Sequence, residues 1–559
     1  MSKFNKDNLN PDNIHFIPLG GSEQFGVNFN LYAYKDQFLA IDCGIGFADH
    51  RYPGIDIMLP DPQYIADQRE KLVGLIITHA HEDHIGAVPH LWPRLQCPIY
   101  CTEFTAKILR RKFDEYPNCK NAQIHVVKAG ESVDIGVYKA HFIPVAHSIP
   151  DTASIVLETD VGKVIHSGDW NLDPTPVIGA RTEEKNFKPH KGAMAYVGDS
   201  TNSNVEGRSV SEKEVEAGLA EVFKGCKKRI AITIFSSNIG RIRSIAKAAA
   251  ANDRSVALVG RSLHNMAGAA IKCGYLNDVA DFISDEDLSY LPEENQVLIV
   301  TGSQGEGRAA LAKIARGEHR DIRLSKGDTV IFSSRAIPGN EAEINHVKNN
   351  LVASGVRIIA TDNTEHCIHV SGHPRRDEVA EMYQWVKPKT VIPVHGERMQ
   401  LEAQADLARS CQIENVIVPN NGSIICLGPD KPEIIDHVET GLIAVDARRL
   451  VRADHHSIVA RRKMQYSGVI HVSLVVNDRG DLIADPEMTT DGILDLENAD
   501  DIRFEENMFA EIEDIFVDMK RKDRQDDHFI SEEIRIGLRR FVFNALGMKP
   551  KTTVHVIRV

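Results

Sequence analysis

The strongest constraint on this chain is a cluster of metal-binding side chains directly after an apolar segment. Residues 72–78 read LVGLIIT, and the chain continues with the run THAHEDH at 78–84. A continuous apolar run of this length is consistent with a strand buried inside a sheet. Three imidazoles and a carboxylate within six residues indicate a metal site at the end of that strand.

The spacing of this run divides its ligands between two positions. In an extended segment His79 and His81 point to the same side. Past the turn, Asp83 and His84 can face a second position, whereas we expect Glu82 to face away. The alternative is a polar surface turn that holds histidines by chance. It is disfavoured because the pattern HxHxDH after a buried strand is very specific.

Further candidate ligands follow later strands of the chain. His147 comes after the apolar stretch HFIPVA, Asp169 lies in HSGDW after the strand KVIH, and His395 ends the strand TVIPVH. Open α/β sheets place their sites at the carboxyl ends of strands. Taken alone, His147 reads equally well as a turn residue and Asp169 as a helix cap. Because the chain also contains HxHxDH, we expect all three side chains to complete the metal site.

This constellation predicts a two-metal hydrolytic centre. Two divalent ions about 3.5–4 Å apart would share Asp169 and a bridging water, and would lower the pKa of that water toward about 7. They would also neutralise a phosphoryl oxygen of the substrate. Asp42, in FLAIDCG, is expected to orient a ligand histidine rather than to bind metal itself.

The order of predicted elements indicates a layered α/β protein with an insertion. Short strands and covering helices, including a helix-like segment at 84–95, fill the first part of the chain. From residue 209 the pattern becomes a doubly wound parallel sheet, with strands expected at 230–235, 255–260, 296–302, 329–334 and 356–361. Short strands then return from residue 366, including 390–395 and 414–419.

The C-terminal part of the sequence differs from the rest in composition and in its predicted elements. Past residue 450 a basic, polar stretch ends in Arg461-Arg462-Lys463. We expect a small α+β domain to follow, with a strand at 468–477, an acidic helical region at 497–520, a helix at 531–546 and a strand at 553–559. The predicted domains are therefore 1–208, the insertion 209–365, the return 366–450, and a linker with the C-terminal domain at 451–559.

Composition excludes several classes of protein. Hydrophobic residues make up 42% of the 559, which excludes a wholly disordered chain. No apolar run approaches the roughly 18 residues that a membrane helix needs. The polar start MSKFNKDNLNPDN and nine cysteines without a CxxC pair favour a reduced, cytoplasmic protein with no membrane contact.

The net charge limits how a polyanion could bind. At −14 the chain has no overall basic field, so a polyanionic substrate would need bound metal or a locally basic groove. Basic clusters occur at 110–112, 227–229, 375–376 and 461–463. Such clusters are most often solvated faces, although one or two of these could line an access groove.

These motifs resemble the metallo-β-lactamase superfamily, whose signature is HxHxDH with later His and Asp ligands. The inserted α/β unit is similar to the β-CASP branch, which acts on nucleic acids, and within it to the ribonuclease J family. The resemblance is carried by GIDIMLPD (54–61), THAHEDHIGAVPHL (78–91), GDST (198–201), SSNIGRI (236–242), VGRSLHNM (259–266), TGSQGE (301–306), SSRAIPGNE (333–341), HVSGHPRRDE (369–378) and PVHGE (393–397). The early loop GGSEQFGVN (20–28) departs from the family pattern Gly-Gly-x-Gly-Glu-Ile-Gly-Lys-Asn.

The resemblance implies a fold and a ligand set. The fold would be a metallo-β-lactamase αββα sandwich with an inserted β-CASP α/β domain and a small C-terminal α+β domain. Asp169 would bridge two Zn²⁺ ions per subunit. One ion would be held by His79, His81 and His147, and the other by Asp83, His84 and His395. Manganese or magnesium are alternatives, since no thiolate selects against them.

The resemblance also implies substrate contacts. The loop His369, Val370, Ser371, Gly372 and His373 would contact the phosphate near the scissile bond. His373 would give a proton to the leaving 3′ oxygen, and so would join Asp83 and Asp169 as a catalytic residue.

Other contacts to RNA are expected farther from the metals. Ser303 in TGSQGE would bind a 5′-monophosphate, although without the resemblance this stretch reads as a turn. Ser236, Asn238 and Arg261 would line the RNA channel. The alternative for Arg261 is a buried structural ion pair.

The predicted function is that of a 5′-to-3′ exoribonuclease with endonuclease activity. It would prefer single-stranded RNA with a 5′-monophosphate, act in mRNA decay and rRNA maturation, form a homodimer or homotetramer, and meet partners in an RNA-decay complex.

One alternative is another hydrolase of this fold, acting on esters, thioesters or DNA. A second is a catalytically silent RNA-decay subunit. The loop at 369–373 and the long insertion argue against the first, and the complete ligand set argues against the second. The choice of RNA over DNA rests on the resemblance alone.

Overall fold

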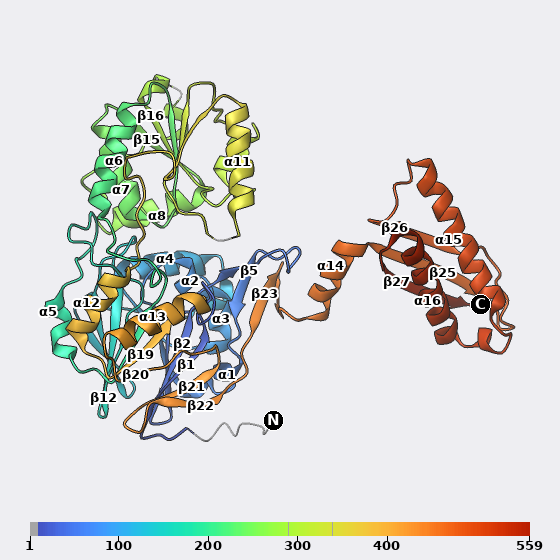
Figure 1. Ribbon diagram of the computed structural model, residues 1–559, viewed down its shortest axis with the longest axis horizontal. Coiled ribbons are helices and arrows are strands. Elements are labelled where there is room, and N and C mark those ends of the chain that lie inside the picture. Colours follow the sequence, from blue (N-terminus) through green and yellow to red (C-terminus); the bar gives the residue numbers. More distant parts are fainter. Residues whose placement is uncertain (1–8, 289, 338) are drawn as a thin grey trace. The chain divides into compact units, whose positions relative to one another are not determined.

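The structure is a computed structural model that describes residues 9–288, 290–337 and 339–559 (Figure 1). Residues 1–8, which begin the first predicted domain and the polar N-terminus, lie outside the described residues. Contacts divide the chain into two units. The first comprises the chain up to Phe47 together with Ile57–Ile443, and the second comprises Ala48–Asp56 with Ala444–Val559.

Two mixed sheets form a sandwich in the first unit. One has the strand order β22 (Glu433–His437), β21 (Ser423–Gly428), β1 (Ile14–Gly20), β2 (Phe29–Tyr34), β3 (Gln37–Ile41), β6 (Leu72–Ile76), β7 (Ile99–Cys101), β8 (Ile124–Val126). The other has the order β20 (Asn415–Val416), β19 (Thr390–Val394), β13 (Ala195–Asp199), β12 (Gly162–His166), β11 (Ala153–Thr159), β10 (Tyr138–Pro144), β9 (Ser132–Ile135). Apolar side chains from both sheets, such as Phe16, Ile41, Phe142 and Val197, pack into one core between them.

Helices complete the layers of this sandwich. A second apolar cluster joins the outer face of the β9–β20 sheet to α5 (Glu184–Phe187), α12 (Arg376–Val386) and α13 (Arg398–Ser410). Other helices of the domain are α1 (Gln63–Ala66), α2 (Glu82–Ile85), α3 (Val88–Leu95) and α4 (Glu103–Asp114), with 3₁₀ turns at Arg69–Lys71, Pro117–Cys119 and Lys188–His190. The short strands β4 (Gly46–Phe47) and β5 (Ile57–Pro60) also belong to this unit.

The expected helix at 84–95 is wrong as a single element. It is divided into α2 and α3 at Gly86 and Ala87, because the backbone N–H of Ala87 donates to the carbonyl of Cys43 at 3.0 Å. Pro89 then lies in the first turn of α3, where a missing N–H is tolerated. The strand expected at 414–419 is also shorter, since only Asn415–Val416 pairs with β19.

The insertion is a five-stranded parallel sheet, as the strand and helix alternation predicts. Its order is β15 (Ser255–Val259), β16 (Gln296–Val300), β14 (Ile230–Thr233), β17 (Thr329–Phe332), β18 (Arg357–Ile359). The helices are α6 (Glu212–Lys224), α7 (Ile239–Ala250), α8 (Arg261–Lys272), α9 (Asp285–Leu288), α10 (Ala310–Ala315) and α11 (Glu341–Ala353), with a 3₁₀ turn at Glu293–Asn295. Figure 1 shows α6 and α7 on one face of the sheet and α11 on the other.

The second unit is a small α+β domain. Its sheet has the order β26 (Glu487–Asp491), β25 (Val469–Val476), β27 (Lys551–Arg558), and α15 (Ala499–Asp518) and α16 (Asp527–Leu546) pack on it through a shared apolar core. Its other elements are β24 (Arg449–Arg452), α14 (His456–Ser467) and a 3₁₀ turn at Asp523–Gln525, while β23 (Leu442–Asp446) spans the boundary between the units.

The basic stretch past residue 450 is helical rather than irregular. It contains α14, and Arg461 on this helix donates to the carboxylate of Asp446 at 2.5 Å and to the carbonyl of Pro53 at 3.4 Å. These bonds join the helix to the segment 48–56 within the same unit. Among the described helices, none combines the length and apolar character needed to cross a membrane.

A fully buried arginine stabilises the insertion next to its return into the sandwich. Arg241 on α7 is 0% exposed, and its guanidinium donates to both carboxylate oxygens of Glu212 at 2.6 and 2.8 Å. Its Nη1 donates to the carbonyls of Ser333 and Ile368 at 3.0 and 3.2 Å. The charge is therefore paired and its hydrogen-bonding capacity used, as a buried guanidinium requires.

Replacing Arg241 by methionine should destabilise the fold strongly. The change leaves Glu212 without its cation in a mostly buried setting, and such losses cost about 3–5 kcal/mol. Differential scanning fluorimetry should show an early unfolding transition in the variant. The matched control is Arg243→Met on the same helix, whose partly exposed ion pairs are worth about 1 kcal/mol or less. Equal transition temperatures for the two variants would contradict this account.

Candidate metal centre

All seven predicted metal ligands converge at one edge of the sandwich. His79, His81, Asp83 and His84 follow β6, whereas His147, Asp169 and His395 follow β10, β12 and β19. Five of them are nearly inaccessible to solvent, namely His79, His84, His147, Asp169 and His395. Sheet geometry explains the convergence, because these strands all end at the same edge.

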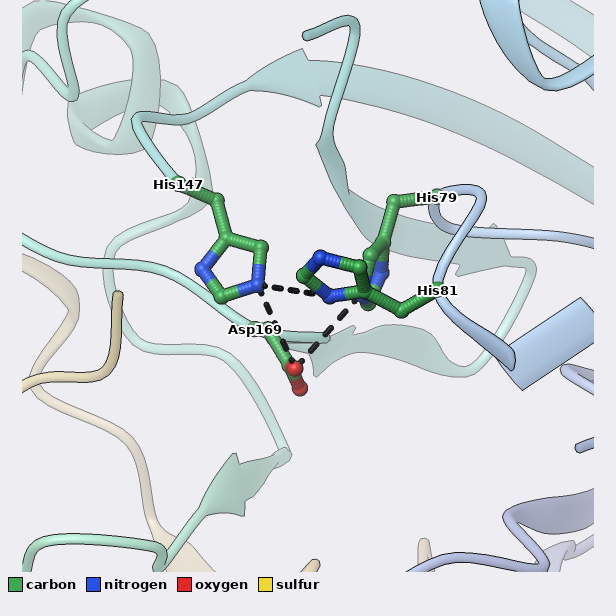
Figure 2. A group of neighbouring side chains, drawn as sticks. All are labelled: His79, His81, His147 and Asp169. Carbon is green, nitrogen blue, oxygen red and sulfur yellow. Dashed lines mark hydrogen bonds and ion pairs between the residues drawn. The ribbon is translucent and has the colours of Figure 1, made fainter. Parts of the chain in front are cut away.

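The first group of ligands contains three histidines and one carboxylate oxygen. Nε2 of His79 and Nε2 of His147 lie 3.5 and 3.6 Å from Oδ2 of Asp169. Nδ1 of His81 lies 3.0 Å from Nε2 of His79 and 3.1 Å from Nε2 of His147. Figure 2 shows the three rings and the carboxylate directed toward a common point. The four ligand atoms all lie within 4.8 Å of one another.

The second group uses the other oxygen of the same carboxylate. Nε2 of His84 and Nε2 of His395 lie 3.4 and 3.6 Å from Oδ1 of Asp169. Oδ2 of Asp83 lies 3.5 Å from Nε2 of His84 and 3.7 Å from Nε2 of His395. Asp169 therefore stands between two separate sets of donors, with one oxygen directed to each set.

The chemistry of these residues fits bound cations. Both oxygens of Asp169 are buried and accept no hydrogen bond from the described residues, although a buried carboxylate normally requires partners. Burial would raise its pKa, but the surrounding histidines, His395 first, hold that pKa well below its usual range. Burial lowers the pKa of His79 and His81, which favours the neutral imidazole that binds metal.

Hydrogen bonds on the far side of the rings fix the ligand atoms. Nδ1 of His84 donates to Asp42 at 2.7 Å, and Nδ1 of His395 donates to the side-chain oxygen of Asn28 at 3.0 Å. This arrangement sets the tautomer and raises ligand basicity. Asp42 and His395 have φ values of 63° and 56°, a left-handed conformation that costs energy in non-glycine residues. Sequence reasoning singled out Asp42 but missed Asn28, although Asn28 ends the early GGSEQFGVN loop.

Glu82 lies outside both groups of ligands. Its carboxylate accepts hydrogen bonds from Nζ of Lys112 at 2.7 and 2.9 Å. The side chain is thus engaged by α4, as expected for the one acidic residue of the run that should face away.

The loop at 369–373 lies against the ligand histidines. The carbonyl of Gly372 accepts from Nδ1 of His147 at 2.8 Å, and a Cβ at this glycine would lie only 2.7 Å from that ring. The hydroxyl of Ser371 accepts from Nδ2 of Asn202 at 2.9 Å. Only glycine therefore allows the loop backbone to approach the metal centre this closely.

His373 is positioned by a carboxylate that sequence reasoning did not single out. Its Nδ1 donates to Oδ2 of Asp199 at 2.8 Å and lies 3.8 Å from Oδ2 of Asp169. Burial lowers the pKa of His373, but Asp199 and then Asp169 outweigh this effect and raise it to about 9. The motif GDST (198–201) was the available signal for Asp199, since Asp199 is the last residue of β13.

The other predicted substrate residues lie in or beside the insertion. Nδ1 of His369 accepts from Arg241 at 3.2 Å, and burial together with that guanidinium lowers its pKa to about 3. Val370 and Asn238 line a small pocket together with His147. The side chain of Asn238 also accepts from the backbone N–H of Arg241 at 2.8 Å, which caps α7.

Ser236, Arg261 and Ser303 show no direct link to the metal ligands. Ser303 is 3% exposed and Ser236 is half-buried. Arg261 begins α8 and is exposed, with no ion pair to any described residue, so the alternative of a buried structural ion pair is wrong. The buried ion pair of the insertion belongs to Arg241 instead.

Family models match most of the chain, in the expected order. The beta-lactamase superfamily domain matches residues 39–188, and the ribonuclease J beta-CASP domain matches 227–351. The RNA specificity domain of Zn-dependent metallo-hydrolases matches 356–419, and the ribonuclease J C-terminal domain matches 457–559. These matches confirm the predicted fold class, while the domain boundaries themselves stay predictions.

Several relatives that cover most of the chain are named ribonuclease J. Ribonuclease J of Sinorhizobium meliloti is 39% identical over 100% of both chains. Ribonuclease J of Mycolicibacterium smegmatis is 36% identical over 84% of both chains, and ribonuclease J 1 of Streptococcus pyogenes is 31% identical over 97% of both. A solved Enterococcus faecalis protein of unknown function shares the fold, with a TM-score of 0.54 at 16% identity over 74% of this chain and 100% of that one. The chain belongs to the ribonuclease J family.

Proposed function

We propose that this protein is a metal-dependent ribonuclease that removes nucleotides from RNA in the 5′-to-3′ direction and also cuts internally. The observation that carries the proposal is Asp169, whose two unpaired, buried oxygens face two separate sets of ligands beside His373. Membership of the ribonuclease J family and the match to an RNA specificity domain support RNA as the substrate.

The ligand sets would hold two Zn²⁺ ions per subunit, with Mn²⁺ or Mg²⁺ as alternatives. His79, His81 and His147 would hold one ion. Asp83, His84 and His395 would hold the other, and Asp169 would serve both. When bound, such ions neutralise a phosphoryl oxygen and lower the pKa of a water molecule toward about 7.

The protein's own residues prepare the leaving group. Asp199 accepts the Nδ1 proton of His373 and so fixes the orientation of the ring. Nε2 is then the atom that can give a proton to the leaving 3′ oxygen, as a general acid does. The backbone of Ser371 and Gly372 lies beside the ligands, where the substrate phosphate would bind. His369 and Val370 complete this loop.

The substrate would be single-stranded RNA with a 5′-monophosphate. Ser303 would bind that terminal phosphate, and Ser236, Asn238 and Arg261 would contact the RNA along the insertion. The cellular role would be cytoplasmic mRNA decay and rRNA maturation, in a homo-oligomer and with partners in RNA decay.

The rival functions are less well supported. The match to an RNA specificity domain argues against hydrolysis of esters, thioesters or DNA. The presence of all seven ligands argues against a catalytically silent role in RNA decay.

End-labelled RNA tests the proposed function directly. Oligonucleotides that carry a 5′-monophosphate should be degraded faster than the same sequences with a 5′-triphosphate or 5′-hydroxyl, because the proposed contact at Ser303 would bind a terminal monophosphate. Products should be resolved on gels, with metal content measured on the same preparation. Equal rates for all three ends would refute the end preference. Inertness with every metal supplied would refute the nuclease assignment.

Replacing His81 by alanine tests the metal assignment. Mutation of a residue that only hydrogen-bonds to a metal ligand typically lowers activity roughly 10–100-fold, and loss of a ligand itself should lower the rate of hydrolysis further. The metal content should fall, and the circular dichroism spectrum should stay unchanged. The matched control is His90→Ala, a nearby histidine that contacts Tyr116 and no predicted ligand. Full turnover by the His81 variant in metal-controlled buffer would show that the ligand set is misassigned.

Replacing His373 by alanine separates proton transfer from metal binding. The variant should keep its metal but cleave about 10²–10⁴-fold more slowly, since that is the usual contribution of a general acid. Asp199→Asn should also lower kcat without changing metal content, because the ring of His373 loses its orientation. The measurements are single-turnover rates and elemental analysis. Loss of metal from the His373 variant would assign this residue to the ligands instead.

A further inference from the structure

Helix α12 carries a buried carboxylate that lies outside both groups of metal ligands. Glu378 is 1% exposed and belongs to none of the possible metal-binding groups among the described residues. Its Oε1 accepts a hydrogen bond from the backbone N–H of Leu172 at 2.9 Å. Its Oε2 accepts from the backbone N–H groups of Ser209 and Arg375 at 2.8 and 2.9 Å. Hydrogen bonds therefore compensate the burial of this charge.

The three N–H groups come from segments that are far apart in the sequence. Leu172 lies three residues after Asp169, Ser209 lies where the chain enters the insertion, and Arg375 lies two residues after His373. The bond to Arg375 alone would be ordinary capping of α12 by its third residue. The other two bonds span 206 and 169 residues of sequence, so capping does not explain them.

Two of these segments lead directly to His373. Only Pro374 separates His373 from Arg375, and its ring fixes φ, so a displacement of Arg375 is passed on to His373. The hydroxyl of Ser209 donates to the carbonyl of His373 at 3.1 Å. The carboxylate of Glu378 thus holds the backbone on both sides of the contact that positions His373.

The third segment leads to the metal ligands. Asn171 precedes Leu172, and its Nδ2 donates to the carbonyl of Gly372 at 3.0 Å. Asp169, two residues earlier, has its Oδ2 3.8 Å from Nδ1 of His373. The distance between the shared carboxylate and the histidine ring therefore depends on two segments that meet at one glutamate.

We propose that Glu378 is a positioning residue that sets His373 against Asp169. The inference rests on the proposed role of His373 as the proton donor. Glu378 acts only through the backbone and does not contact the reacting atoms. Reacting groups must be held within about 0.5 Å of their productive geometry. A misplacement of about 1 Å can lower the rate about 10²-fold.

Replacing Glu378 by glutamine tests this role in the full-length protein. The amide has the same size, but its NH₂ group cannot accept from a backbone N–H, so at least one segment is released. Cleavage of RNA should slow about 10²-fold, with the metal content unchanged. The matched control is Glu381→Gln on the same helix, whose partly exposed side chain pairs with Arg208 and which should cleave like the wild type.

A second variant leaves the carboxylate in place. Ser209→Ala keeps the backbone N–H that donates to Glu378 and removes only the hydroxyl that donates to the carbonyl of His373. It should lower the rate in the same direction but by less. This variant carries the test if Glu378→Gln does not fold, as judged by circular dichroism.

A change of leaving group separates positioning of the acid from general damage. In the proposed hydrolysis, a water oxygen bonds to phosphorus, the bond from phosphorus to the 3′ oxygen breaks, and Nε2 of His373 gives its proton to that oxygen. When sulfur replaces the 3′ oxygen, it can leave as a thiolate without a proton, because a thiol has a pKa near 8.5. With this RNA, the deficits of Glu378→Gln and His373→Ala relative to the wild type should each shrink at least about ten-fold.

The outcomes are separable. A Glu378→Gln deficit that is equal on both linkages, while that of His373→Ala shrinks, would overturn the proposal, as would wild-type cleavage by Glu378→Gln. Crystal structures of wild type and variant test the positioning without turnover. The ring of His373 should move relative to Asp169 by more than about 0.5 Å, and an unmoved ring would also overturn the proposal. A wild type that does not cleave RNA would count against the nuclease assignment, and the crystal structures would still decide the positioning role.

Discussion

The metal centre depends on one carboxylate that the protein itself does not satisfy. Asp169 is 1% exposed, and neither of its oxygens accepts a hydrogen bond from the described residues. A buried carboxylate without hydrogen-bond partners is costly, and bound cations would supply the missing partners. The surrounding imidazoles are already oriented by Asp42, Asn28 and Gly372. The ring orientations that metal binding requires are therefore set by the protein's own hydrogen bonds.

The insertion contributes to this organisation although its sheet lies outside the sandwich. The chain leaves the sandwich soon after Asp199 and returns before His373, and the hydrogen bond between these two residues closes that long excursion at the metal centre. Arg241, inside the insertion, donates both to the carbonyl of Ile368 and to Nδ1 of His369. A buried ion pair of the insertion thus holds the start of the loop that contacts the ligands. Stability of the insertion and geometry of the site are coupled through a few hydrogen bonds.

Features of the site that depend on neighbouring residues in the sequence could be predicted, whereas features that depend on contacts between distant residues could not. The run at 78–84 places four ligands close together after one strand, and His147, Asp169 and His395 each follow a recognisable strand. The parallel sheet of the insertion followed from its alternating elements. Asn28 could not be predicted, because its role comes from His395, 367 residues later. Arg241 looks like a solvent-facing residue of an amphipathic helix, and only tertiary packing shows that it is buried.

The acidic character of the chain becomes compatible with a polyanionic substrate only through local charge. The net charge of −14 repels nucleic acid at long range, and a Debye length of about 8 Å in physiological salt screens most of that repulsion away from the surface. Close to the site the balance differs, because two divalent cations would outweigh the carboxylates of Asp83 and Asp169 that hold them. Productive binding would thus depend on bound metal at the scissile phosphate. This dependence would keep an acidic protein from holding RNA indiscriminately along the rest of its surface.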